Sequence, residues 1–150
     1  MNDDFDKEDA TTAAISAVRE CANTLASEAD RLQQALPHLV MEEALRGRAF
    51  EWSDALRDTA QRVLFELALL QAETGEGRRA EPAAVIRRLS GLDAATMEVV
   101  AASTGLIEEL EVAAERDEAQ EPAFVFVIEM VTRLMTACES AQAATREIGQ

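Results

Sequence analysis

The chain has 150 residues, with 29 acidic and 14 basic side chains and therefore a net charge of −15 at pH 7. Its length is typical of one domain that buries its own core, and its composition, with six glycines, three prolines and no tyrosine, favours helices. The negative field would repel a nucleic acid or an anionic membrane, so we expect direct binding to neither.

The acidic balance leaves several functions open. Its ordinary meaning is solubility, but it is also compatible with a basic protein partner, with metal ions, or with mimicry of a phosphate backbone. The chain has a single histidine and a single lysine, so carboxylates are almost the only general bases available. The sequence therefore gives no support to an enzyme.

The first predicted helix follows a short acidic segment. We expect residues 1–8 to form a disordered tail and residues 9–150 to form a single helical-bundle domain, with Asp6 or Asp9 as the helix cap. The segment has no apolar stretch like that of a signal peptide, so we expect a cytoplasmic protein. Apolar residues then recur at heptad spacing until Pro37 ends the helix. These are Ile15, Val18, Ala22, Leu25, Ala29, Leu32 and Leu36.

The second segment is the least regular one. Pro37 is suited to open a short helix through Arg46, and Gly47 is suited to stop it. Ser53 and Asp54 then resemble an N-cap followed by an acid in the first turn of a longer helix. The apolar face of that helix consists of Trp52, Leu56, Ala60, Val63, Leu67 and Leu70.

The third segment follows the clearest loop, residues 73–79. We expect a break near Gly91, because Ser90 and Asp93 resemble a capping box at that point. Gly105 lies within a run of small residues, which indicates a bend or a close contact between helices. The inward positions are Val85, Ile86, Leu89, Leu92, Val99, Ser103, Leu106, Leu110 and Ala113.

The last segment, Glu121–Ile148, has the longest apolar seam of the chain. Pro122 is suited to the first turn of a helix, where its missing N–H costs nothing. The seam consists of Phe124, Val127, Val131, Leu134, Cys138, Ala141, Thr145 and Ile148. A helix this long, about 40 Å, needs neighbours of similar length, which the other three segments supply.

Four long helical segments joined by short loops predict an all-α fold. We expect an antiparallel four-helix bundle with breaks in the second and third helical segments, near Gly47 and Gly91. The alternative is a less regular array of six shorter helices.

The single histidine and the two cysteines do not form a recognisable catalytic or metal-binding motif. His38 lacks both the Glu-x-x-His pair of a di-iron bundle and the sequence context of a phosphotransfer helix, so we interpret it as a surface or cap histidine. Cys21 and Cys138 lie on or beside apolar seams, which predicts buried thiols rather than a disulfide.

An acidic cluster at residues 108–121 is the only candidate metal site. Glu108, Glu111 and Glu115 share one helix face, where their oxygen atoms are geometrically able to bind Mg²⁺ or Ca²⁺. No companion motif occurs on another helix, so we interpret the cluster as a solvated face and expect no metal and no cofactor.

A basic cluster is the candidate anion site. Arg78, Arg79, Arg87 and Arg88 lie around the start of the third segment, where free N–H groups of a helix also attract anions. The chain has neither of the glycine-rich phosphate motifs, so we interpret these arginines as partners of nearby acids.

Large apolar residues lie on the outer faces of two predicted helices. At 100° per residue, Phe65 lies about 200° from Val63 and Phe126 about 200° from Phe124. Each phenylalanine therefore lies opposite the apolar seam of its own helix. Leu69 and Met130 lie beside them. Clustered large apolar residues on a surface mark an interface, so we predict one here, in a homodimer or with another protein. The alternative is that residues 39–52 fold over all four.

The favoured function is therefore a non-enzymatic helical-bundle interaction protein, such as an adaptor, a secretion chaperone or an antagonist of a basic partner. One alternative is a bundle that binds a small molecule or a divalent metal through the acidic cluster 108–121, with hydrolysis as the activity open to it. Another is a mimic of nucleic acid, which would need carboxylates spaced like phosphates along one face.

Overall fold

The computed structural model describes residues 3–75 and 82–148, and all their regular structure is helical. The elements are α1 (Asp3–Ala35), η1 (Leu36–His38), α2 (Glu43–Gly75), α3 (Pro82–Ala101), α4 (Ser103–Arg116), η2 (Glu118–Gln120) and α5 (Glu121–Ile148). Helix α1 begins within the segment for which we expected a disordered tail. None of the described helices combines the length and the apolar character needed to cross a bilayer.

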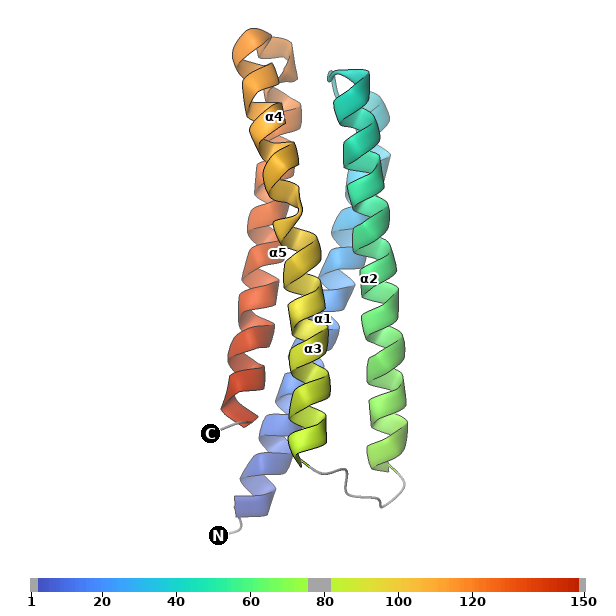
Figure 1. The fold of residues 1–150 in the computed structure, drawn as a ribbon, viewed down its shortest axis with the longest axis vertical. Coiled ribbons are helices and arrows are strands. Elements are labelled where there is room, and N and C mark those ends of the chain that lie inside the picture. The colour runs from blue at the N-terminus through green and yellow to red at the C-terminus, as the bar shows by residue number, and fades with distance from the viewer. Residues whose placement is uncertain (1–2, 76–81, 149–150) are drawn as a thin grey trace.

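The helices form an antiparallel four-helix bundle, which confirms the predicted fold class (Figure 1). Helix α1 runs up, α2 runs down, α3 and α4 together run up as one column, and α5 runs down. Helix α1 packs against both α2 and α5, and the α3–α4 column also packs against both. Helices α2 and α5 therefore occupy opposite corners of the bundle.

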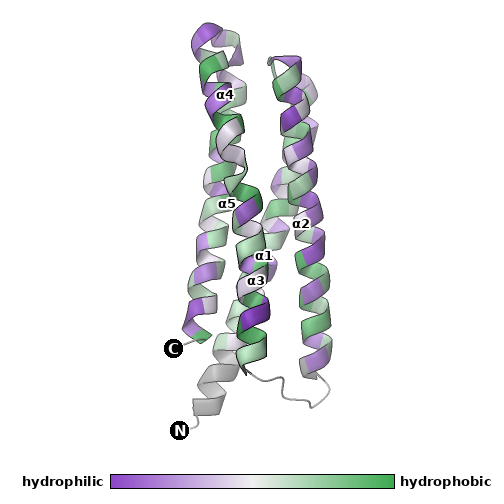
Figure 2. Ribbon diagram, viewed as in Figure 1, coloured by the Kyte–Doolittle hydropathy of each residue, from purple (hydrophilic) through white to green (hydrophobic). Residues whose placement is uncertain are grey.

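The heptad ladder of α1 is buried along its whole length, as predicted. Each of its seven apolar residues, from Ile15 to Leu36, is at most 8% exposed. Burying a leucine or valine side chain contributes about 1.5–3 kcal/mol, so this ladder is a large part of what holds the bundle together. Figure 2 shows how hydrophobic and polar residues alternate along the four columns.

The seam of α5 differs at two positions from the predicted one. Ala123 and Met130 are fully buried, whereas Phe124 and Val131 are only partly buried. The remaining predicted positions are correct, from Val127 through Ile148. A flexible methionine fills irregular gaps between helices, which suits it to the centre of this seam.

The predicted break near Gly47 is wrong, because α2 continues through this residue. A glycine inside a helix costs only about 1 kcal/mol, which the packing of a long helix outweighs. The chain is instead interrupted between η1 and α2, where Arg46 donates a hydrogen bond to the Leu39 carbonyl at 2.9 Å. Ser53 is not an N-cap but a buried residue within α2, and it accepts a hydrogen bond from Gln33 at 2.9 Å.

The predicted break near Gly91 is also wrong, because α3 continues to Ala101 and the column bends at Ala102. In an unbroken helix, the amide of Ser103 would donate to the Val99 carbonyl. Here the indole Nε1 of Trp52 donates to that carbonyl, at 2.8 Å. The bend thus lies within the run of small residues that indicated one.

Gly105 forms a close contact between helices. The Arg48 side chain of α2 lies 3.7 Å from the place that a Cβ atom would take at this glycine. Arg48 also forms an ion pair with Glu109 of α4. The two contacts join α2 to α4, and the Trp52 hydrogen bond joins α2 to the end of α3.

Candidate functional site

An apolar strip lies on the outer face of α2. Helical periodicity turns Val63, Leu67 and Leu70 into the core, and it turns Phe65 and Leu69 outward. Phe65 is 64% exposed and Leu69 is 41% exposed. We define the α2 strip as Phe65 and Leu69 with two exposed alanines, Ala68 and Ala72.

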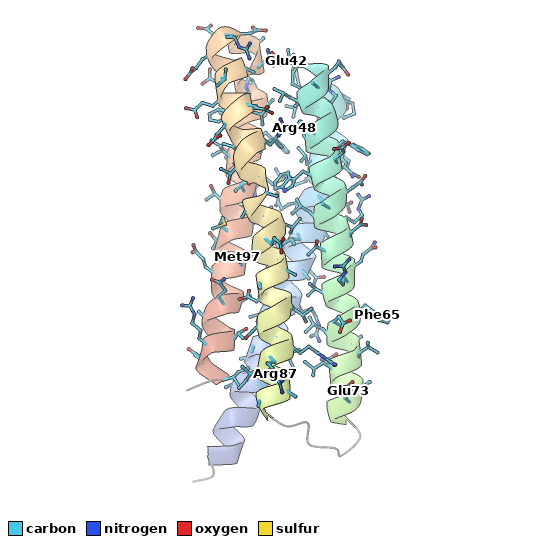
Figure 3. The ribbon with its side chains drawn as sticks, viewed as in Figure 1. Glu42, Arg48, Phe65, Glu73, Arg87 and Met97 are labelled. Atoms are coloured by element: carbon cyan, nitrogen blue, oxygen red, sulfur yellow. The ribbon has the colours of Figure 1, made fainter. Side chains whose placement is uncertain are left out.

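The strip is accessible because no other segment of residues 3–75 and 82–148 lies over it. Figure 3 shows Phe65 pointing away from the bundle. Residues 39–52 do not cover it, because most of them form the first turns of α2 itself. At 1.5 Å per residue, Trp52 lies about 20 Å from Phe65 along the axis of that helix. The alternative in which this segment folds over the strip is therefore excluded.

Charged side chains surround the strip. Asp58 is exposed two turns before Phe65, and Glu66 lies beside it, half-buried. Arg62 is the exposed basic residue on this part of the helix. Glu73, at the end of α2, forms an ion pair with Arg88 of α3 at 3.1 Å. The surroundings therefore carry a net negative charge, in keeping with the chain as a whole.

The half of the predicted interface on α5 is wrong. Met130 is fully buried in the core, and Phe126 is partly buried against it. The guanidinium of Arg31, on α1, lies over the Phe126 ring at 5.7 Å from its centroid, a cation–π arrangement. The angular positions of residues around one helix do not reveal which of them a long side chain of a neighbouring helix covers.

A charged pair closes the same side of the bundle. Glu28 is buried on α1, and its two carboxylate oxygens accept hydrogen bonds from Arg133 of α5, at 3.1 and 2.9 Å. Together with the Arg31–Phe126 contact, this pair covers the junction of α1 and α5 with polar groups. The predicted interface is thus reduced to its half on α2. Elsewhere in the described chain, the exposed large apolar side chains are Val40, Phe50, Val112 and Val125.

The three candidate metal ligands do not form a site with other acidic residues of the described chain. Glu108, Glu111 and Glu115 are exposed on α4. Across residues 10–73 and 83–148, no group of three or more His, Cys, Asp or Glu side chains is placed to hold a metal ion.

The two described arginines of the candidate anion site, Arg87 and Arg88, differ in their surroundings. Arg88 pairs with Glu73, Arg87 is exposed, and Arg78 and Arg79 lie outside the described residues. The pairing of Arg88 agrees with the interpretation that these arginines neutralise nearby acids. His38 is exposed at the end of η1, as a surface histidine should be.

Asp93 is a buried residue of α3 and not the capping residue that its sequence context predicted. This residue is only 7% exposed, at a core position of α3 between Leu89 and Thr96. Burial raises the pKa of Asp93 to about 6, and the positive charge of Arg146 opposes that rise. The spacing of Leu89, Asp93, Thr96 and Val100 is that of an inward helix face, and it would have placed this carboxyl inside.

The two cysteines meet behind Asp93. The sulfur atoms of Cys21, on α1, and Cys138, on α5, lie 3.5 Å apart, and both residues are buried as free thiols. The hydrogen bond that they share, together with burial, raises the pKa of Cys21. The prediction of buried thiols rather than a disulfide is confirmed.

Comparisons of the chain with models of protein families, with curated proteins and with solved structures give no match.

Proposed function

We propose that this chain is a non-enzymatic interaction protein that binds a helical, partly basic segment of another protein through the α2 strip. An adaptor, a chaperone or an antagonist would each work in this way. The single observation that carries the proposal is the 64% exposure of Phe65 beside an exposed Leu69. Large apolar side chains grouped on an otherwise charged surface are typical of a binding site.

The strip is suited to an amphipathic helix. Phe65 and Leu69 are four residues apart, so they are adjacent on the helix surface and present one continuous apolar ridge. A partner helix can place its own apolar residues along this ridge, as in helix-in-groove recognition. Covering a fully exposed Phe or Leu contributes about 1.5–3 kcal/mol. Phe65 and Leu69 are 64% and 41% exposed and so contribute less, which together supports a modest, reversible affinity.

Charge favours a basic partner over a second copy. A homodimer would bring two chains of net charge −15 together, with Asp58 and Glu66 beside the interface. A segment with lysine or arginine next to its apolar residues would gain from the same carboxylates and would associate faster. A homodimer built on the strip stays the alternative, and light scattering distinguishes the two.

The location of this interaction is part of the proposal. The two cysteines face each other as free thiols, which is typical of a reducing compartment. We therefore place the protein in the cytoplasm.

The test compares two exposed phenylalanines of the same helix. Phe65→Ser removes the ridge, whereas Phe50→Ser changes a side chain that is 47% exposed about 22 Å away along α2. Proteins captured from the native host by the wild type are identified, purified and titrated against all three chains. We expect Phe65→Ser to weaken binding about tenfold or more, equivalent to about 1.4 kcal/mol, and Phe50→Ser to leave it unchanged.

Equal binding by Phe65→Ser and the wild type would show that the strip is not the binding site. A wild type of about twice the 16.3 kDa chain mass in light scattering, reduced to one chain mass by Phe65→Ser, would replace the basic partner with a second copy. Circular dichroism of both variants establishes that they remain folded.

A further inference from the structure

An unpaired carboxylate lies buried at the junction of α3 and α5. Asp93 is 7% exposed, and its Oδ1 atom is inaccessible and has no hydrogen-bond partner. Burying a carboxylate oxygen without a hydrogen-bond donor destabilises the folded state, and no residue of the described bundle compensates for that cost. The other oxygen, Oδ2, also has no hydrogen-bond partner but is not enclosed, so a ligand beside Asp93 can donate a hydrogen bond to it.

A hollow opens beside this carboxylate. It has a volume of about 210 Å³. Its lining residues are Ser90, Asp93, Ala94, Gln142, Thr145 and Arg146. Most of them carry polar side chains, and the volume is below that of the pockets that hold drug-sized ligands, about 300–1,000 Å³. The size and the lining are suited to a small polar molecule rather than to a nucleotide or a flat cofactor.

The hollow presents both signs of charge without a contact between them. Arg146 of α5 lies close enough for its charge to act on Asp93 of α3, yet the two residues form no ion pair. The Thr145 hydroxyl donates to the Ala141 carbonyl at 2.8 Å, which leaves its oxygen available as an acceptor. Gln142, half-buried, adds an amide with both donor and acceptor atoms.

These charges exclude the simplest ligands. The Asp93 carboxylate would repel a ligand that carries only a negative charge. The Arg146 guanidinium would repel a ligand that carries only a positive charge. A metal ion would find one carboxylate and no further strong ligand, whereas Mg²⁺ and Ca²⁺ need about six oxygen ligands. A molecule with an ammonium at one end and a carboxylate at the other satisfies both residues.

We propose that the hollow between α3 and α5 binds a small zwitterion, a free amino acid with a short side chain. Its ammonium group donates to Asp93, and its carboxylate accepts from Arg146, with the Gln142 amide beside them. The Thr145 hydroxyl oxygen accepts a second hydrogen bond from the ammonium. This site is separate from the α2 strip, and it does not depend on the function proposed for the strip.

The experiment titrates the isotope-labelled full chain with glycine, L-alanine and L-serine, followed by NMR shifts of backbone amides at residues 90–94 and 142–146. Methylamine and acetate serve as half-ligands that carry only one of the two charges. We expect at least one amino acid to bind with a Kd of about 1 mM or tighter, and each half-ligand to bind at least tenfold more weakly.

Two variants test the two charges separately. Asp93→Asn keeps the shape and removes the negative charge, and Arg146→Gln removes the positive charge from an exposed position. We expect each to lose at least tenfold in affinity. Glu98→Gln, an exposed residue of α3 away from the hollow, is the matched control and should bind as the wild type does.

Three results would each overturn the assignment. The first is the absence of saturable shifts with every amino acid. The second is equal binding of methylamine and glycine, which would describe a cation site. The third is unchanged affinity in Arg146→Gln, whose exposed position keeps the test usable even if Asp93→Asn fails to fold.

Discussion

The indole of Trp52 donates a hydrogen bond to the carbonyl of Val99, across 47 residues of sequence and at a distance of 2.8 Å. In an unbroken helix the amide of Ser103 would donate to that carbonyl, which lies where α3 bends into α4 at Ala102. The tryptophan is the only one in the chain and is 7% exposed. The bend and the residue that satisfies it are therefore a single unit, contributed by two helices.

We predict that Trp52→Phe destabilises the protein by about 1–3 kcal/mol, because the variant keeps an aromatic ring but leaves the Val99 carbonyl without its donor. Urea unfolding followed by circular dichroism measures this difference. Phe50→Leu, at an exposed site two residues away, should change stability by less than about 0.5 kcal/mol. Equal stability of Trp52→Phe and the wild type would mean that water replaces the indole at no cost.

Loss of Arg133 should destabilise the α1–α5 junction. Arg133→Met leaves the buried Glu28 carboxylate without two hydrogen bonds, and we expect a cost of about 1–3 kcal/mol in thermal or urea unfolding. Arg31 also approaches Glu28, but at 3.6 Å and from a side chain that is 55% exposed. Arg31→Met should therefore cost less than Arg133→Met, and the reverse order would contradict the assignment of the main contact.

Asp93 should make the protein less stable at neutral pH than in mild acid. Its pKa is raised from 3.8 to about 6, so the folded state binds a proton more readily than the unfolded state does. The stabilisation is complete below about pH 4 and is lost as the pH rises through about 6. The rise corresponds to about 3 kcal/mol at most.

The measurement is the free energy of unfolding of the wild type minus that of Asp93→Asn, between pH 4 and pH 8. The variant is needed because other carboxylates of this acidic chain titrate over part of the same range. Arg146 faces Asp93 from α5, and Cys21 and Cys138 lie near it from α1 and α5. A difference that does not change with pH would show that Asp93 titrates normally.

The two thiols should be unreactive in the folded protein. Cys21 and Cys138 are 1% and 0% exposed, and the raised pKa of Cys21 opposes formation of the reactive thiolate. We expect Ellman's reagent to modify neither under native conditions and to modify both within seconds in guanidinium chloride. Rapid modification of the native chain would require an opening of the bundle between α1 and α5.

Sequence periodicity predicted the bundle because its strongest signals were long. The ladder of α1 and the segment Glu121–Ile148 each span many turns, and so a single glycine or proline does not disturb the pattern. The breaks were misplaced because glycine costs little inside a packed helix, whereas the true bend depends on Trp52, which is distant in sequence from Val99.

Of the predicted apolar surface, only the half on α2 is correct, because contacts between helices cannot be read from one helix alone. Phe65 and Leu69 are exposed because nothing from another helix reaches them. Phe126 has the same angular position on its own helix, but Arg31 from α1 covers its ring. Asp93 was missed because its resemblance to a capping residue concealed its inward position on α3.

The bend at Ala102 also divides the third column by its neighbours. Helix α3 packs against α1, α2 and α5, whereas α4 packs against α2 and α5 and makes no close backbone approach to α1 in the described chain. Because α4 does not pack against the buried apolar ladder of α1, fewer packing contacts hold α4 in the bundle than hold α3. Its amide hydrogens should exchange with solvent through a partial opening that leaves the other helices folded, so the column behaves as two cooperative units in one helix direction.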